Sequence, residues 1–161
     1  MYSLPVLFSF RDLIEGKDFT AGVVVNGRAL LVEEGDGDVW LYGVHPGAMA
    51  GGGKGRDAAV QEFRNGFRSV LIDLAGEADS FEAFRQEVVQ FFEATDAETA
   101  AEWNTALEKV RSTNAAATTN LPVVNADERP PLIHVFRPNV QEGPTPDLMS
   151  INRLVELANA A

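Results

Sequence analysis

Cysteine is absent from this chain, and only two histidines occur, His45 and His134. Without cysteine there is no disulfide framework, no thiolate nucleophile and no zinc site made of thiolates, which fits a reducing cytoplasm. Neither histidine belongs to a recognisable triad or metal-ligand motif. We therefore predict no catalytic residue, no metal site and no cofactor.

Basic residues are also scarce. Thirteen Lys and Arg against twenty-four Asp and Glu give a net charge of −11, which repels phosphate backbones and attracts cationic proteins or peptides. Three arginines, Arg56, Arg64 and Arg68, fall on one predicted helix, but Asp57 and Glu62 interrupt them. This pattern favours a solvated helix face, so nucleic acid is not an expected partner.

Long hydrophobic runs are missing as well. Residues 4–10 are apolar but contain Pro5, follow no basic residue and precede Arg11 and Asp12, so we expect neither a signal peptide nor a membrane span. Apolar side chains are nevertheless plentiful: 45% of the 161 residues are hydrophobic, with ten Phe and two Trp. This length and composition predict one folded domain with a single core.

The first third of the chain has the pattern of an antiparallel β-meander. Asn26-Gly27 lies between two aliphatic runs and accepts the positive φ angles of a two-residue hairpin turn, which predicts a hairpin with its turn there. A second turn at residues 35–38 leads into a strand at 39–44. Residues 4–10 are expected to add an edge strand. Apolar residues occur on both faces of these strands, so both faces should be covered.

Three amphipathic segments follow the meander. Apolar residues at helical spacing predict a helix over residues 57–75. Asp79 with Glu82, and Thr95 with Glu98, have the capping-box spacing and predict the starts of two more helices, which would pack as a helical hairpin on the second face of the sheet. The predicted fold class is α+β, an antiparallel β-meander with a packed amphipathic helix, elaborated by a helical hairpin.

The domain organisation follows from these elements. We expect a single α+β core over residues 1–112, with the helical elaboration at 79–111, and a loop or linker of small residues and prolines over 113–131. Residues 132–161 should form a strand, at 132–136, that rejoins the sheet, and a short helix. Helical spacing of apolar residues marks that final helix: Leu148, Ile151, Leu154, Val155 and Leu157.

A glycine-rich segment, residues 47–55, precedes the first helix and has to be compared with phosphate-binding loops. A Walker A loop needs Gly, four residues, then Gly-Lys and Ser or Thr, whereas Ala48 holds the first of these positions and Gly55 the last. The favoured interpretation is a flexible connection in which the backbone passes close to a neighbour. Anion binding by its exposed amides remains an alternative.

Acidic residues crowd the turn before the third strand, at Glu33, Glu34, Asp36 and Asp38. Carboxylates at this density can bind calcium. An EF-hand loop would continue with another oxygen ligand and a glycine, but Val39 follows here. The pattern is that of a solvated hairpin turn.

Several segments occur together in a characteristic order: a strand, an acidic-glycine turn, a strand ending in Pro-Gly, a glycine loop and an amphipathic helix. They are residues 29–34, Gly35-Asp36-Gly37-Asp38, residues 39–44, Pro46-Gly47, Gly53-Lys54-Gly55 and Ala58-Ala59. This order resembles the core of HicB-type antitoxins, which have a partial RNase H-like fold. Where that family commonly has a Gly and a Thr or Ser ahead of a Glu-Ala pair, this chain has Gly55-Arg56-Asp57-Ala58.

The resemblance implies a non-catalytic, homo-oligomeric domain, over about residues 18–75, that neutralises a small basic toxin by binding it. The negative charge agrees with such a partner. Residues 132–161 leave no room for a helix-turn-helix or ribbon-helix-helix segment, so operator binding is not expected. A magnesium-dependent nuclease of the RNase H-like group needs carboxylates in mid-strand. Uncharged residues stand at those positions: Leu30, Leu31, Leu41 and Tyr42.

Five residues are predicted to contact a partner or ligand: Trp40, Tyr42, His45, Gly53 and Lys54. The two aromatics are candidate interface anchors, with core packing as the commoner alternative at strand positions. His45, next to the glycine segment, is a candidate contact or pH-sensitive residue, with the filling of a loop end as its alternative. An alternative function stays open. In it the chain is a small-molecule-binding or enzymatic α+β domain whose pocket lies between sheet and helices, around Trp40, Tyr42, His45 and Trp103.

Overall fold

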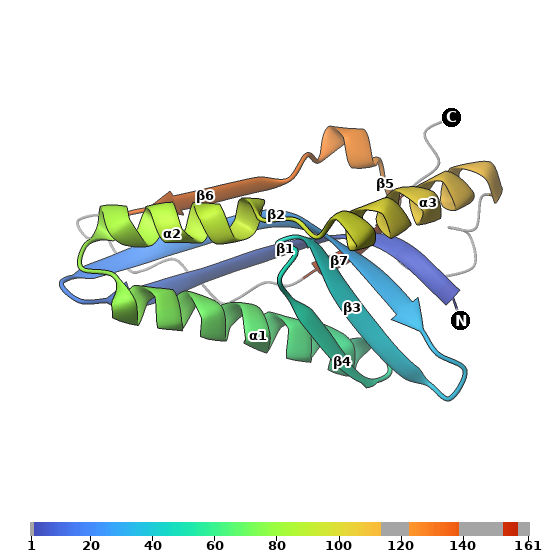
Figure 1. The fold of residues 1–161 in the computed structure, drawn as a ribbon, viewed down its shortest axis with the longest axis horizontal. Coiled ribbons are helices and arrows are strands. Elements are labelled where there is room, and N and C mark those ends of the chain that lie inside the picture. The colour runs from blue at the N-terminus through green and yellow to red at the C-terminus, as the bar shows by residue number, and fades with distance from the viewer. Residues whose placement is uncertain (1, 114–122, 139–152, 158–161) are drawn as a thin grey trace.

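A long β-hairpin forms the frame of the molecule. The computed structural model describes residues 2–113, 123–138 and 153–157 (Figure 1). Strands β1 (Tyr2–Gly16) and β2 (Phe19–Glu33) have 15 residues each and pair antiparallel along their whole length. Lys17 and Asp18 form the turn between them, where Asp18 adopts a φ of 58°, a conformation that Asp tolerates better than most residues.

Five more strands complete one sheet around this hairpin. β3 (Asp38–His45) and β4 (Ala50–Lys54) continue the meander from β2, and β6 (Leu132–Phe136) pairs with the other half of β2. β7 (Arg153–Leu157) pairs with β1, and β5 (Val123–Val124) pairs with β7. The strand order is β4-β3-β2-β1-β7-β5, with β6 beside β2. The expected strand at 132–136 does rejoin the sheet.

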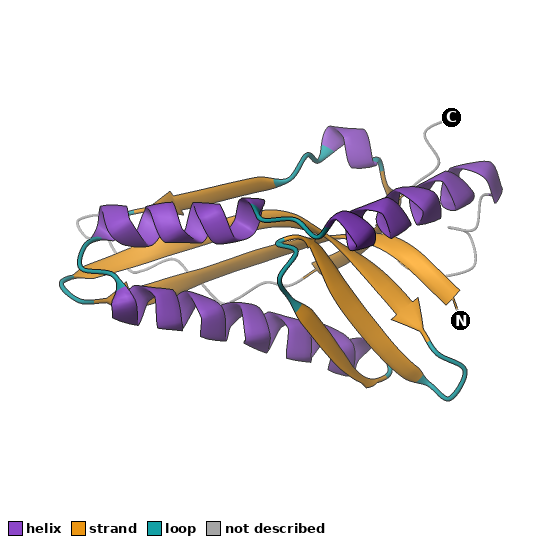
Figure 2. Cartoon of the chain, viewed as in Figure 1, coloured by secondary structure: helices purple, strands orange, loops and turns teal. Residues whose placement is uncertain are grey.

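Helices cover the sheet from both sides, which confirms the α+β class (Figure 2). They are α1 (Arg56–Glu77), α2 (Phe81–Glu93) and α3 (Ala97–Thr113). A short 3-10 helix, η2 (Ala126–Glu128), precedes β6. None of the described helices is both long enough and apolar enough to span a membrane.

The larger core lies on what we call the first face, the side of the sheet that carries Phe8 and Phe10. Helices α1 and α2 bury their apolar stripes against it. Ring pairs join the layers, with centroids 5.1 Å apart for Phe8 and Phe63 and 4.6 Å apart for Phe10 and Phe67. Aromatic pairs in these arrangements add to the stabilisation that comes from area burial alone.

A smaller core occupies the opposite side, the second face. There Leu7, Leu30, Val32 and Val44 pack against residues of α3, of which Trp103 is the largest. The predicted helical hairpin is therefore wrong: α2 packs mainly on the first face and α3 mainly on the second. Each helix buries its stripe against a sheet face, so the two helices need not pack on each other.

The predicted turn at Asn26-Gly27 is also wrong, because both residues lie inside the continuous strand β2. Gly27 pairs with Phe8, and a Cβ atom on Gly27 would collide with the Phe8 ring and with the His45 carbonyl oxygen. Glycine is thus required there for close packing and not for a turn. Residues 4–10 are a strand as expected, but one in the interior of the sheet, between β2 and β7.

The helix starts differ from prediction by one residue each. Ser80, not Asp79, caps α2, with its Oγ accepting a hydrogen bond from the backbone N–H of Ala83 at 3.1 Å. Asp96, not Thr95, plays this part before α3, where its Oδ1 accepts from the N–H of Thr99 at 2.8 Å. Both are serine or aspartate caps of the usual kind.

The expected C-terminal helix is not found where the structure describes the chain. Residues 153–157 form strand β7, and Leu148 and Ile151 lie outside the described residues. Within the predicted linker, β5 and η2 take up residues 123–124 and 126–128, while 114–122 lie outside the described residues.

Candidate functional site

Trp40 and Tyr42 form an exposed aromatic pair on strand β3. Their rings are stacked, with centroids 6.2 Å apart and planes inclined by 16°, and each residue is 38% exposed. Both lie on the second face, opposite Val32 and Leu30 of β2. Val44, two residues further along the strand, is already buried by α3. The aromatic pair therefore continues this apolar face beyond the part that α3 covers.

Strand β4 supports the Trp40 ring. Gly52 is the residue paired with Trp40, and a Cβ atom on Gly52 would lie 2.5 Å from Cε3 of the indole. The ring thus lies directly over the β4 backbone, where any larger residue would displace it. This contact explains why a glycine is present at this strand position and holds the indole flat on the sheet.

An acidic turn adjoins the aromatic pair. Carboxylate oxygens of Glu34, Asp36 and Asp38 all lie within 4.8 Å of one another. The Lys54 ammonium lies 2.7 Å from Asp38 and 4.0 Å from Asp36. Three carboxylates face one ammonium group, so the turn keeps a net negative charge. Because Lys54 already occupies the neighbourhood of two of these exposed groups, we assign no metal ion to them.

Local contacts favour the charged forms of Asp36 and Lys54. A hydrogen bond from the backbone of Asp38 and the nearby Lys54 charge hold the pKa of Asp36 below its ordinary value. The hydrogen bond to Asp38 raises the pKa of Lys54 above its ordinary value. Both pKa directions favour the ion pair between these two side chains.

Residues 50–54 of the glycine segment form strand β4 and not the flexible connection that we expected, although the expected close approach of its backbone is confirmed. A Cβ on Gly51 would collide with the backbone of Phe63 in α1, and one on Gly53 would lie 2.7 Å from the Cβ of Ala58. Gly53 therefore faces α1. Its position serves packing between sheet and helix.

Two other predicted residues, His45 and Trp103, are more deeply buried than the aromatic pair. The guanidinium of Arg28 stacks over the Trp103 ring at 4.7 Å, and Arg28 is paired with His45 across the strands. Trp103 is 2% exposed. Burial, and secondarily the Arg28 charge, lower the pKa of His45, whose ring lies 5.9 Å from that of Phe92. His45 therefore lies beside Phe92 of the first-face core, whereas Trp103 is buried on the second face with Leu30 and Val44 and is not exposed as Trp40 and Tyr42 are.

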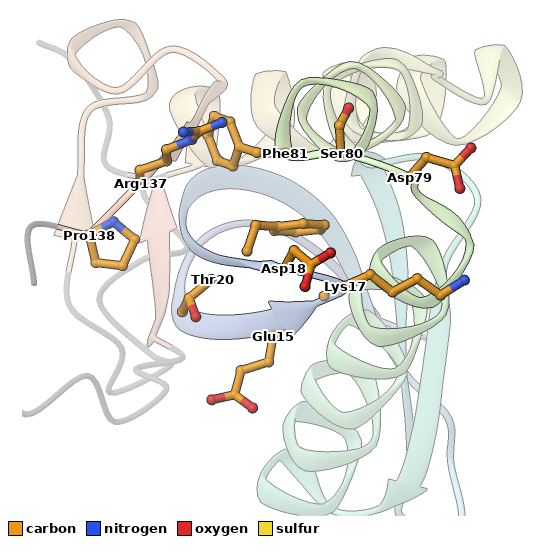
Figure 3. Close-up of a pocket in the computed structure, with 11 residues that line it drawn as sticks. Glu15, Lys17, Asp18, Thr20, Asp79, Ser80, Phe81, Arg137 and Pro138 are labelled. Carbon is orange, nitrogen blue, oxygen red and sulfur yellow. The ribbon is translucent and has the colours of Figure 1, made fainter.

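A cleft of about 640 Å³ lies at the opposite end of the hairpin, at the turn between β1 and β2 (Figure 3). The start of α2 and the end of β6 complete it, and the Arg137 guanidinium stacks over the Phe81 ring at 4.8 Å. Charges of both signs line the cleft. None of the four residues of the predicted pocket, Trp40, Tyr42, His45 and Trp103, is among its lining residues.

Two features of the site were not predicted. Arg28 was assigned to a strand after a hairpin turn, so nothing indicated its stacking on a tryptophan 75 positions later in a different element. The acidic turn was interpreted as solvent-facing only, and the alternation of β3, which puts Trp40 and Tyr42 on one face beside it, was the available indication.

Comparison of the chain with models of protein families, with curated proteins and with solved structures found no match. The geometry of the site and the charge of the chain are therefore the observations from which its function is inferred.

Proposed function

We propose that this chain is a non-catalytic protein-binding module, of the HicB-like antitoxin kind, that holds a small basic protein. The binding site in this proposal is the aromatic–acidic surface, which we define as Trp40, Tyr42, Glu34, Asp36 and Asp38. The observation that carries the proposal is the stacked, 38% exposed aromatic pair beside three clustered carboxylates.

The chemistry of this surface suits a cationic partner. Exposed Trp and Tyr are the side chains most often found as energetic anchors of protein interfaces, and their ring faces attract Lys and Arg. The neighbouring carboxylates add charge-assisted hydrogen bonds. The net charge of −11 steers a basic protein towards the chain from a distance and makes association faster at low salt.

Catalysis is a weaker interpretation of the same residues. A general acid or base works best with a pKa near the operating pH, whereas the pKa of Asp36 is held below its ordinary value. His45 is partly buried, and its Nδ1 has no hydrogen-bond partner among the described residues. Nothing at the aromatic–acidic surface combines a nucleophile with a base that would activate it.

The identity of the partner as a toxin follows from the resemblance to HicB-type antitoxins alone. Strands β2 and β3, joined by the acidic-glycine turn, and the helix α1 support this part of the proposal, although strand β4 stands where the resemblance has a glycine loop. The charge of the chain supports a basic partner independently of the resemblance.

Affinity capture from an extract of the native cells tests the proposal. The wild type should retain a basic protein, which is then identified, purified and recombined with the chain in vitro. The double variant Trp40→Ala/Tyr42→Ala and the double variant Asp36→Asn/Asp38→Asn should each lose that protein. Equal capture by all forms, or a partner that is acidic, would contradict the proposal.

Matched controls come from the other side of the molecule. Ile72 on α1 is 49% exposed, so Ile72→Ala removes an exposed apolar side chain elsewhere. The double variant Asp73→Asn/Glu87→Gln removes two exposed charges from α1 and α2. Both controls should capture the partner as the wild type does.

A further inference from the structure

Strand β4 lies at one end of the sheet, and β3 is the only strand of the described residues with which it pairs (Figure 1). An outer strand has a row of backbone N–H and C=O groups directed away from its neighbour. Which residues supply this row depends on the phase of the hydrogen bonds between β3 and β4.

Two hydrogen bonds fix that phase, one at each end of the pairing. The N–H of Gly43 donates to the carbonyl of Met49 at 2.8 Å, and the N–H of Gly55 donates to the carbonyl of Gly37 at 3.0 Å. In an antiparallel pair the bonded residues alternate, so Gly51 and Gly53 are turned towards β3. The outward row consists of Ala50, Gly52 and Lys54.

Within the described part of the chain, this edge has neither the proline nor the bulge that protects many outer strands. Natural edges are blunted by proline, by bulges or by side chains that carry charge. Here residues 50–54 are Ala-Gly-Gly-Gly-Lys, and the one charge, on Lys54, is engaged with Asp38. The close approach of α1 explains Gly51 and Gly53, and the Trp40 ring, which lies over Gly52, explains Gly52.

We infer that the β4 edge receives an extended, cationic segment of the partner protein as an additional strand. This inference rests on the proposed function and names the mode of binding. The outward N–H and C=O groups of Ala50, Gly52 and Lys54 would pair with the backbone of the segment, as in other β-strand additions. Alternate side chains of the segment would meet the Trp40 ring, because Gly52 places no side chain between them.

Charge complementarity selects this occupant over a second copy of the chain. Each copy carries a charge of −11, so edge-to-edge pairing of two copies brings like charges together. A lysine- or arginine-bearing segment instead meets the carboxylates of Glu34, Asp36 and Asp38 and the face of the Trp40 ring.

The test uses the full chain and a synthetic eight-residue peptide of alternating lysine and valine with blocked ends. Binding should protect the backbone amides of Ala50, Gly52 and Lys54 from hydrogen exchange, measured by NMR. The comparison peptide has the same sequence but is N-methylated at its two central residues, which blocks one N–H on each of its edges. Its affinity should be about tenfold lower, as expected for the loss of one hydrogen bond at the edge that pairs with β4.

A pair of protein variants tests the same edge from the other side. Ala50→Pro removes an outward N–H at the first residue of β4, where proline is tolerated, and keeps the bonds to β3. Ala50→Ser keeps that N–H. Peptide affinity should fall about tenfold in Ala50→Pro and stay within about twofold in Ala50→Ser. Should Ala50→Pro fail to fold, the methylated peptide and the exchange data still decide the question.

Three results would overturn the inference. The first is equal affinity for both peptides while Trp40→Ala/Tyr42→Ala abolishes binding, which leaves the proposed function standing without strand addition. The second is a wild-type dimer, seen by light scattering, that Ala50→Pro dissociates, because the occupant would then be a second copy. The third is no binding of the peptide at all; the capture experiment then judges the proposed function separately.

Discussion

Strand β3 presents two different surfaces, one on each side of the sheet. On the first face, Val39 and Leu41 are 4% and 0% exposed, under the α1 and α2 layer. On the second face, Trp40 and Tyr42, which alternate with them, are each 38% exposed. A strand buried on one side has no packing need for large aromatics on the other, so this difference separates residues that hold the fold together from residues available for recognition.

The two sides also differ in how glycine is used. Gly51 and Gly53 let α1 approach the first face closely, whereas Gly52 leaves room for the Trp40 ring on the second. The same short strand thus serves the core on one side and the aromatic–acidic surface on the other. Substitutions on the two sides should have separable effects, on stability for the first face and on binding for the second.

The largest expected effect is on stability and comes from the first face. Phe63 is 1% exposed and its ring contacts that of Phe8. Phe63→Ala should lower the free energy of unfolding by about 3–5 kcal/mol, the usual cost of deleting a buried aromatic ring. Tyr42→Ala should lower it by less than about 1 kcal/mol. Urea denaturation measures both, and similar losses would erase the distinction between the faces.

A glycine pair gives the next largest effect. Gly51→Ala places a methyl group against the backbone of Phe63 and should cost about 1–3 kcal/mol of unfolding free energy, because neither backbone can yield freely. Gly35, in the turn, has open space around it, and Gly35→Ala should change stability by less than about 0.5 kcal/mol. A much smaller loss of unfolding free energy in Gly51→Ala would mean that α1 does not contact β4 as closely as described.

A substitution of Lys54 tests whether the carboxylates of the second face attract a cationic segment. If the carboxylates attract a cationic segment, Lys54→Ala should raise the affinity for the lysine–valine peptide about threefold at low salt by removing a competing ammonium group. The gain should shrink as salt is added. Lys17→Ala, at the far end of the hairpin, makes the same change in net charge and should have less effect. A loss of affinity in Lys54→Ala would make Lys54 itself a contact residue, as first predicted.

The smallest expected effect is a pH dependence of stability. Because burial and Arg28 hold the folded-state pKa of His45 below its ordinary 6.5, the unfolded chain binds a proton more readily than the folded chain. The stability from neutral His45 is present above pH 6.5 and is lost as the pH falls below that value towards the folded pKa. His45→Gln should flatten this part of the stability profile. The exposed His134→Gln serves as control, and an equal change in both variants would contradict the account.

The sequence predicted those elements whose cause is local. The acidic-glycine turn, strand β3, helix α1 and strand β6 follow from turn chemistry and from apolar periodicity, and all four are present. The cap residues differ by one position, because Ser80 and Asp96 compete with equally suitable neighbours at Asp79 and Thr95. Local patterns cannot decide between adjacent residues of the same capping ability.

The errors arose where distant contacts decide the structure. Gly27 is required by the ring of Phe8, nineteen positions earlier and across the hairpin, and nothing in residues 23–32 reveals this. Strand β4 contains three consecutive glycines, which disfavour a strand by propensity, and its pairing with β3 and the close packing of α1 against Gly51 and Gly53 are contacts with distant parts of the chain. The side of the sheet on which each helix packs is likewise a tertiary property.

The binding role of the candidate residues stays a prediction, but their placement can be compared with the sequence. Alternation along β3 predicted that Trp40 and Tyr42 share one face, and in the structure they are adjacent there. Their 38% exposure depends on where α3 ends its cover of that face, which the sequence does not show. His45 and Gly53 were placed with them by their position in the chain. In the structure His45 is turned towards Arg28 and Phe92, and Gly53 towards α1, by contacts that the sequence does not show.

The central claim is that the aromatic–acidic surface exists for binding and not for folding. Calorimetric titration of the captured basic partner into wild type and into Trp40→Ala/Tyr42→Ala, with the unfolding free energy of each form, tests this most directly. We predict an affinity loss of about a hundredfold or more, as for two interface anchors, with a stability change that is small beside it. Unchanged affinity in a folded double variant would contradict the claim.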